Sequence, residues 1–163
     1  MEGKPVSASY VESTSLVQPF HSNVYGQLFG GHLMELVDNT AGISAYRHSG
    51  TMVVTISVDN LVFKAPAPVG SILTIKAAVN RVFKTSMEVG VQVTALLPEN
   101  GKKSLVCPAY LTFVALDAHG KPTEIPPVIP ETEDEIRRFE NALIRREARL
   151  ALAERIRYKT HAV

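Results

Sequence analysis

A single helical segment is followed by a long run of strand-like segments, and this order restricts the fold more than any other feature of the chain. From Gly31 to about Tyr46, apolar residues recur at helical spacing around most of the circumference, which predicts a buried helix. Between residues 52 and 116 apolar residues recur at every second position instead, as in strands. Residues 6–18 have a weaker strand pattern. The order predicts an α+β domain in which a curved antiparallel sheet of about five strands surrounds a long central helix.

Turn signals divide the strand region into four segments. They span about residues 52–63, 71–83, 87–95 and 105–116. In the first, the apolar positions change parity after Val58, so we expect a β-bulge near Asp59 and Asn60. In the third, apolar and polar residues alternate regularly, which predicts a strand with one face in solvent. One sheet around one helix leaves an edge strand uncovered, and we therefore expect the chain to self-associate.

The end of the chain has a different composition. Residues 121–130, "KPTEIPPVIP", cannot be helical throughout. Thr132 and Glu135 then form a capping-box pattern, and a charged helix is predicted from there to about Lys159. Its arginines are interleaved with glutamates, which predicts a face that is solvated or contacts a neighbouring subunit; they are Arg145, Arg146, Arg149, Arg155 and Arg157. We divide the chain into one domain, residues 1–125, and a Pro-rich linker with a C-terminal charged helix, residues 126–163.

Composition narrows the function classes. A chain of 163 residues with 45% apolar and 20% charged residues is typical of one globular domain. The net charge of +1 gives no reason to expect nucleic acid or an anionic membrane as a partner, and no apolar run reaches transmembrane length. The single cysteine, Cys107, lies in an apolar strand and is interpreted as a core residue, which fits a cytoplasmic protein. The five histidines lack metal-ligand spacing, so we expect no metal site.

The stretch "NVYGQLFGGHLMELVD", Asn23 to Asp38, is the strongest candidate for a site. Gly30 and Gly31 at a helix start would present free backbone N–H groups, which can stabilise an oxyanion. Asp38 follows two turns later, about 10 Å along the helix, so one bound carbonyl could not reach both. An aspartate from one subunit could more easily serve the glycine amides and the asparagine of a second. The residues alone leave open a simpler reading, a tight turn followed by a helix whose Asp38 faces water.

A second candidate is the segment "RVFKTS" between two predicted strands. It contains Arg81, Lys84, Thr85 and Ser86, which could hold phosphate groups. A solvated hairpin end is the alternative.

The first stretch also carries a family motif. Asn-x-x-Gly-x-x-Phe-Gly-Gly-x-x-Met-x-x-x-Asp resembles the signature of the hot-dog-fold acyl-CoA thioesterases, both the bacterial short-chain acyl-CoA thioester hydrolases and one half of the animal cytosolic acyl-CoA hydrolase. Matching stretches follow at Val54–Phe63 and at Val69-Gly70, and the resemblance covers about residues 6–118. It implies a long central helix wrapped by a curved sheet, with active sites at the interface of paired hot dogs and often a hexamer, a trimer of dimers.

The resemblance also assigns roles to residues. Asp38 matches the catalytic acid, Asn23 a residue that positions substrate or water, and Gly31 with Gly30 the backbone donor to the thioester oxygen. The segment 81–86 lies where related enzymes hold parts of coenzyme A. The implied function is hydrolysis of acyl-CoA to free fatty acid and CoA without a cofactor, with Asp38 as general base or as nucleophile. A hot-dog protein that binds or senses acyl-CoA without chemistry is the alternative; a hydratase ranks last, since its Asp-x-x-x-x-His motif is absent.

Overall fold

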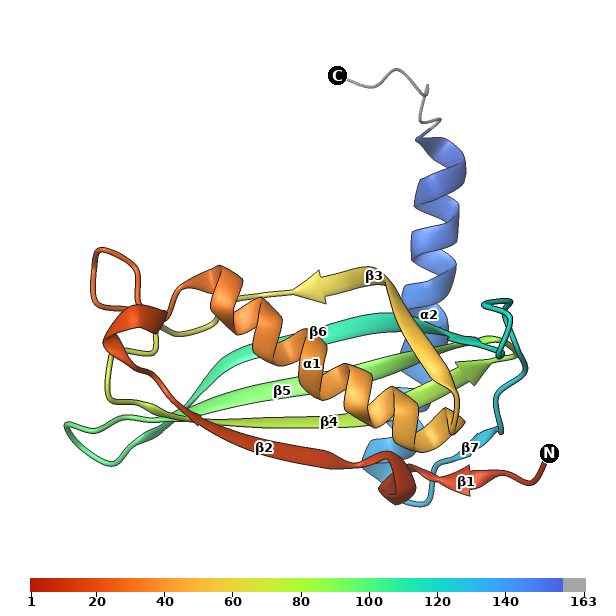
Figure 1. Cartoon of the computed structure of the whole chain (residues 1–163), viewed down its shortest axis with the longest axis horizontal. Helices are drawn as coiled ribbons and strands as arrows, with labels where there is room; N and C mark the ends of the chain where they lie inside the picture. The colour runs from red at the N-terminus through yellow and green to blue at the C-terminus, as the bar shows by residue number, and fades with distance from the viewer. Residues whose placement is uncertain (157–163) are drawn as a thin grey trace.

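The computed structural model describes residues 1–156, and its centre is one helix lying against one antiparallel sheet (Figure 1). The helix is α1, Gly30–Ser49. The sheet has the strand order β2-β4-β5-β6-β3. Its strands are β2 Val11–Leu16, β3 Met52–Leu61, β4 Ile72–Phe83, β5 Ser86–Leu96 and β6 Lys103–Leu116. The predicted α+β architecture, with about five strands curved around a central helix, is confirmed.

The remaining elements are short, apart from the last helix. They are β1 Lys4–Pro5 and β7 Val128–Ile129, which pair in parallel, the 3-10 turns η1 Val6–Ser9 and η2 Pro19–His21, and the helix α2 Glu133–Arg155. The strand predicted for residues 6–18 therefore begins only at Val11. Ser9 ends the preceding turn, where its buried Oγ donates to the Val6 carbonyl and accepts from the Val79 N–H. The Val79 amide of β4 therefore binds a side chain at this point and does not pair with a strand.

One face of α1 is packed on the sheet and the other is open. The buried face consists of Leu33, Val37, Ala41 and Ala45, and its alanines let the helix approach the strands closely. Ile43 and Tyr46 on the other side are exposed. The prediction of burial around most of the circumference is thus wrong for the single chain, since one sheet can cover only one side of a helix.

Strand β3 is an edge of the sheet and is irregular. Its register with β6 shifts between Val58 and Asn60, which confirms the predicted bulge, and again between Thr55 and Ser57. Its other edge is unpaired among the described residues. An open edge next to the open side of α1 gives the chain one continuous uncovered region.

Helix α2 crosses the outer face of the sheet, opposite α1, and covers part of it (Figure 1). Glu88 on β5 is fully buried there, where it accepts hydrogen bonds at 2.7 and 2.9 Å from Arg145 and one at 2.9 Å from Asn80. The guanidinium of Arg145 also lies 3.7 Å from the ring centre of Tyr110. The prediction that this face of β5 is solvated is therefore wrong at Glu88, because its partner Arg145 lies on α2, 57 residues later in the chain.

Arg149 anchors α2 at the edge strand. It donates to Asp59 on β3 and to Thr112 on β6, at 2.7 Å in each case. Burial works to raise the pKa of Asp59, but the hydrogen bonds from Arg149 and Ser57 outweigh it and hold this pKa below its usual range. The interpretation of the helix arginines as solvated or as subunit contacts is therefore wrong for Arg145 and Arg149.

The start of α2 is as predicted, and its end lies near the limit of the described residues. Thr132 Oγ1 accepts from the Glu135 N–H at 3.2 Å, and Glu135 accepts from the Thr132 N–H at 3.0 Å, so the capping box is confirmed. The predicted extension to Lys159 and the role expected for Arg157 fall outside the described residues. No helix within residues 1–156 is long and apolar enough to cross a membrane.

The buried Glu88–Arg145 pair should matter for stability. Glu88→Ala leaves Arg145 and Asn80 without their acceptor, and we expect a loss of about 3 kcal/mol in the free energy of unfolding. The matched control is Arg137→Ala, which breaks the exposed pair with Asp134 and should cost about 0.5 kcal/mol or less. Urea unfolding at one protein concentration measures both; equal losses would contradict the assignment.

The low pKa of Asp59 makes stability depend on pH in a defined direction. Its carboxylate stabilises the folded state fully above the pKa of an unfolded aspartate, about 4, and this contribution is lost as the pH falls through the lower folded-state pKa. We expect the stability difference between the native chain and Asp59→Asn to be large at neutral pH and to shrink in acid. Urea unfolding across this range tests it, with Glu140→Gln on the exposed side of α2 as control; a difference independent of pH would refute it.

Candidate active site

The first turn of α1 presents backbone donors with no acceptor. Phe29 caps the helix without a side-chain hydrogen bond, and its carbonyl accepts from the Leu33 N–H. Among the described residues, nothing accepts from the N–H groups of Gly30, Gly31 or His32. The Phe29 ring lies so close to Gly31 that a Cβ there would be 2.5 Å from a ring carbon. These amides and the helix dipole suit a developing negative charge.

Asn23 belongs to the loop that leads into this turn. Its Oδ1 accepts from the N–H groups of Tyr25 and Gln27 at 2.9 and 3.2 Å, and the side chain is exposed. The Phe29 N–H donates to the His21 carbonyl at 2.8 Å, which closes the loop against the start of α1. The fold therefore brings Asn23 to the same end of α1 as Gly30 and Gly31, with its amide nitrogen free to donate.

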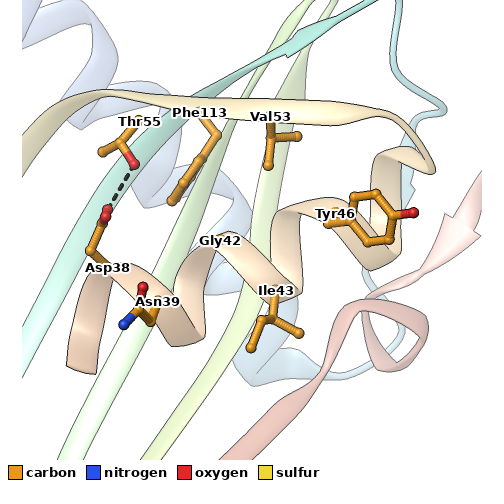
Figure 2. Close-up of a pocket in the computed structure, with 8 residues that line it drawn as sticks. All are labelled: Asp38, Asn39, Gly42, Ile43, Tyr46, Val53, Thr55 and Phe113. Carbon is orange, nitrogen blue, oxygen red and sulfur yellow. Dashed lines mark hydrogen bonds between the residues drawn. The ribbon is translucent and has the colours of Figure 1, made fainter. Parts of the chain in front are cut away.

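Asp38 lies in the middle of α1, in a hollow between the helix and β3 (Figure 2). Its Oδ1 accepts a hydrogen bond of 2.7 Å from the Thr55 hydroxyl. The hollow has a volume of about 370 Å³, and its lining is Asp38, Asn39, Gly42, Ile43, Tyr46, Val53, Thr55 and Phe113. Thr55 uses one side of the carboxylate, and the other side stays accessible on the open face of the molecule.

Asp38 is not brought to the glycine amides within one chain. Both lie on α1, and the seven residues from Gly31 to Asp38 span about 10 Å along its axis. A second hollow, of about 310 Å³, lies beside the first turn instead, with Gln27, Leu33, Phe63 and Lys64 among its lining residues. One subunit therefore carries two separate candidate half-sites.

The segment 81–86 is the hairpin between β4 and β5, at the far end of α1. The Lys84 carbonyl accepts from the Ile125 N–H. The carbonyl of Pro126, the residue after Ile125, is hydrogen-bonded to His48 in the last turn of α1. Since α1 has 20 residues, this corner is nearly 30 Å from Gly30.

In three of the four predicted phosphate ligands of this corner, the side chain has a partner within the chain. Arg81 stacks on the Phe139 ring of α2 and donates to the Phe139 carbonyl at 3.2 Å. Lys84 is exposed and pairs with Glu124 at 3.7 Å, and Ser86 bonds the Phe83 carbonyl at 3.5 Å. Thr85 contributes its carbonyl to the Ala115 N–H. Of these three side chains, Lys84 has the most distant polar partner.

Thr55 is the residue that the sequence interpretation missed. The structure places Thr55 on the inward face of β3 with Val53, whereas the apolar even positions Met52 and Val54 are exposed on the other face. The local alternation therefore favours the wrong face, and a hydroxyl between apolar neighbours is the only local signal of Thr55. The inward face meets Asp38 only because β3 runs along α1, which the local pattern does not specify.

Other chemically active side chains do not form a centre. Within residues 1–156, no three His, Cys, Asp or Glu residues are grouped so that they could hold a metal ion. Cys107 is fully buried, as predicted, and burial raises the pKa of its thiol. His48 is buried too, and burial lowers its pKa despite the hydrogen bond to the Pro126 carbonyl. The half-sites on α1 remain the best candidates for chemistry.

Comparison with known proteins identifies the family. Residues 25–98 match the thioesterase superfamily. The uncharacterized acyl-CoA thioester hydrolase YkhA of Bacillus subtilis is 42% identical over 128 residues, which are 78% of this chain and 74% of YkhA. The chain belongs to the acyl-CoA thioesterases of this superfamily. It is also 42% identical over 154 residues to mouse acyl-coenzyme A thioesterase 11, although it spans only 26% of that protein.

Solved acyl-CoA thioesterases share the whole fold. An apo-hexameric acyl-CoA thioesterase superposes with a TM-score of 0.91 at 38% identity, over 94% of this chain and 98% of that one. The acyl-CoA hydrolase of Staphylococcus aureus, solved with butyryl coenzyme A and coenzyme A, has a TM-score of 0.87 at 39% identity, over 93% of each chain. The hot-dog fold expected from the motif is therefore confirmed.

The Staphylococcus aureus enzyme offers a comparison of residues. It has been solved as variants in which an asparagine, an aspartate or a threonine is replaced by alanine. These three positions follow one another at intervals of 15 and 17 residues. Asn23, Asp38 and Thr55 follow one another at the same intervals in this thioesterase chain.

Proposed function

We propose that this chain hydrolyses acyl-CoA thioesters to a free fatty acid and CoA. The observation that carries the proposal is the Asp38 carboxylate, oriented by the Thr55 hydroxyl and accessible on its other side. The shared spacing of Asn23, Asp38 and Thr55 with the positions studied in the Staphylococcus aureus hydrolase supports it. Residues 1–125 carry the catalytic fold in this proposal, and α2 belongs to the tail, residues 126–163.

The active site is completed by a second copy of the chain. Asp38 and Gly31 of one helix are too far apart to act on one carbonyl, whereas the helices of two copies could place them face to face. The open side of α1 and the free edge of β3 offer the surface for this pairing. The hexameric state of a relative with the same fold supports self-association, and we propose a dimer that assembles further as a trimer of dimers.

The mechanism divides the work between the copies. The thioester carbonyl lies against the Gly31 N–H of one subunit, with Gly30 beside it, and the amide of Asn23 positions the substrate or water. Asp38 of the other subunit takes a proton from water, whose oxygen attacks the carbonyl carbon. The C–S bond then breaks, and Asp38 returns this proton to the departing sulfur, so that the products are the fatty acid and the CoA thiol. Alternatively, the carboxylate attacks the carbonyl carbon directly, the C–S bond breaks and the CoA thiolate leaves; water then hydrolyses the resulting anhydride to the fatty acid and the free Asp38 carboxylate, and the proton released protonates the thiolate. Thr55 holds the carboxylate in place on either route.

The hairpin 81–86 contributes to coenzyme A binding from the partner. It lies at the far end of α1 from Gly30, so antiparallel pairing of two helices would bring the hairpin of one copy toward the glycines of the other. Arg81, Lys84, Thr85 and Ser86 supply donors to phosphates there. No cofactor or metal enters this mechanism. We place the protein in the cytoplasm, where its single buried thiol would stay reduced.

Replacing the acid and its orienting hydroxyl tests the assignment. We expect Asp38→Asn to lower kcat by about a thousandfold or more, since neither a base nor a nucleophile remains. Thr55→Val keeps the shape and loses the hydrogen bond, so kcat should fall by about tenfold to a hundredfold with KM little changed. Thiol release from acetyl-, butyryl- and palmitoyl-CoA measures both and reveals the chain-length preference. Binding of acyl-CoA without thiol release by the native chain would instead favour an acyl-CoA sensor.

Removing the backbone donor tests the oxyanion site. Gly31→Pro deletes the N–H, and proline is tolerated in the first turn of a helix. We expect kcat to fall about a hundredfold or more. Gly31→Ala is the control, because it keeps the N–H and requires only that the Phe29 ring moves. Equal activity of the two variants would remove the Gly31 amide from the mechanism.

Mixing the two inactive variants tests whether a site is shared. In a mixed dimer of Asp38→Asn with Gly31→Pro, a shared arrangement leaves one site with both native groups. After dissociation and reassembly we expect about a quarter of native turnover, since half of the dimers are mixed and each has one intact site. If both groups acted within one chain, the mixture would stay inactive, so absence of recovery in a reassembled sample refutes the shared site.

A further inference from the structure

Helix α2 crosses the outer face of the sheet strand by strand. Phe139 contacts Arg81 on β4, Arg145 binds Glu88 on β5, and Arg149 binds Asp59 on the edge strand β3. From Phe139 to Arg149 the helix rises about 15 Å. Three strand spacings, from β4 to β3, are about 14 Å. The helix therefore runs nearly perpendicular to the strands, directly toward the open edge.

The helix does not end where its own sheet ends. Arg149 binds the edge strand, but α2 continues to Arg155, about 9 Å further and thus past about two strand spacings. Figure 1 shows this end of α2 projecting beyond β3. All residues from Leu150 to Ile156 are exposed. We call residues 150–156 the α2 overhang.

The sheet-facing side of α2 changes in chemistry at this point. Positions seven residues apart lie on the same side of a helix, so Leu152 continues the position of Arg145 and Ile156 that of Arg149. Arg145 and Arg149 bind buried carboxylates of the sheet, while Leu152 and Ile156 are 56% and 45% exposed. A stripe that becomes apolar where it leaves its own sheet is suited to another apolar surface.

Such a surface lies on the outer face of β3. Val53 and Thr55 point toward α1, so by alternation Met52 and Val54 lie on the outer face, where they are 64% and 40% exposed. Ile56 at the bulge is exposed as well. The chain's own α2 passes over β3 at Asp59 and leaves these residues uncovered.

We propose that the α2 overhang of one copy packs on the outer face of β3 of a second copy, with Leu152 and Ile156 over Met52 and Val54. This rests on the proposed pairing of two copies along β3. If two antiparallel β3 strands meet around an axis near Ile56, a helix that crosses its own β3 at Asp59 reaches the second copy's β3 near residue 53. The contact is reciprocal, so each dimer contains it twice. It stabilises the pairing of the two copies from the outer face of the sheet, opposite α1.

Cross-linking of the full chain tests the contact directly. We expect Leu152→Cys with Met52→Cys to give a covalent dimer with a short bismaleimide, and each single variant to give none. Ile144→Cys with Met52→Cys is the matched control, because Ile144 is exposed on the side of α2 that faces away from the sheet. Cys107 is buried and does not compete.

Light scattering separates the possible failures. A dimeric or larger mass without cross-linking at position 152 overturns this inference and leaves the proposed function standing. A monomeric mass overturns the inference together with the shared active site. Cross-linking at position 152 but not 144 supports the contact, whatever the thiol-release assay reports about hydrolysis.

The strength of the contact can be measured in the same chain. We expect Leu152→Glu with Ile156→Glu to raise the concentration at which the assembly dissociates by about tenfold or more, because four apolar side chains per dimer lose their cover. Ile144→Glu adds one such charge on the outward side of α2 and should leave the assembly unchanged. Equal behaviour of the two proteins would contradict the proposal and leave the overhang free for an occupant other than a second copy.

Discussion

A sheet can cover only one side of a helix, and the arrangement of this thioesterase follows from that constraint. The alanines on the buried face of α1 bring it close to the strands, and the opposite face stays open together with the edge strand β3. Asp38 and Thr55 lie in this open region, so the surface proposed to bind a second copy also carries the proposed catalytic acid. In this proposal, catalysis and assembly are linked through one face of the molecule.

The outer face of the sheet is organised by charge. Glu88 and Asp59 would be costly to bury alone, and each is matched by an arginine of α2. Removing either arginine would leave a buried carboxylate unpaired, so these pairs specify where the helix lies and in which direction it runs. That direction takes its C-terminal end past β3, toward the region where a second copy would lie.

The predictions that succeeded depend on local periodicity and those that failed depend on distant partners. The helix over Gly31–Tyr46, the bulge near Asp59 and the capping box at Thr132 were predicted because each involves neighbours in the chain. The burial of Glu88 could not be predicted, since its partner Arg145 is 57 residues away. Thr55 was missed for the same reason, since its partner Asp38 is 17 residues earlier on another element.

The sequence by itself determined the α+β order, the glycines that begin the central helix, and the family motif with Asn23 and Asp38. These follow from spacing along the chain, which sets which side chains share a face of a helix or strand. Only the tertiary structure decided that Asp38 is held by Thr55, that Glu88 is buried against Arg145, and that α2 crosses the sheet toward its open edge. Such relations depend on how elements pack, and packing joins residues whose separation in sequence carries no information about their distance in space.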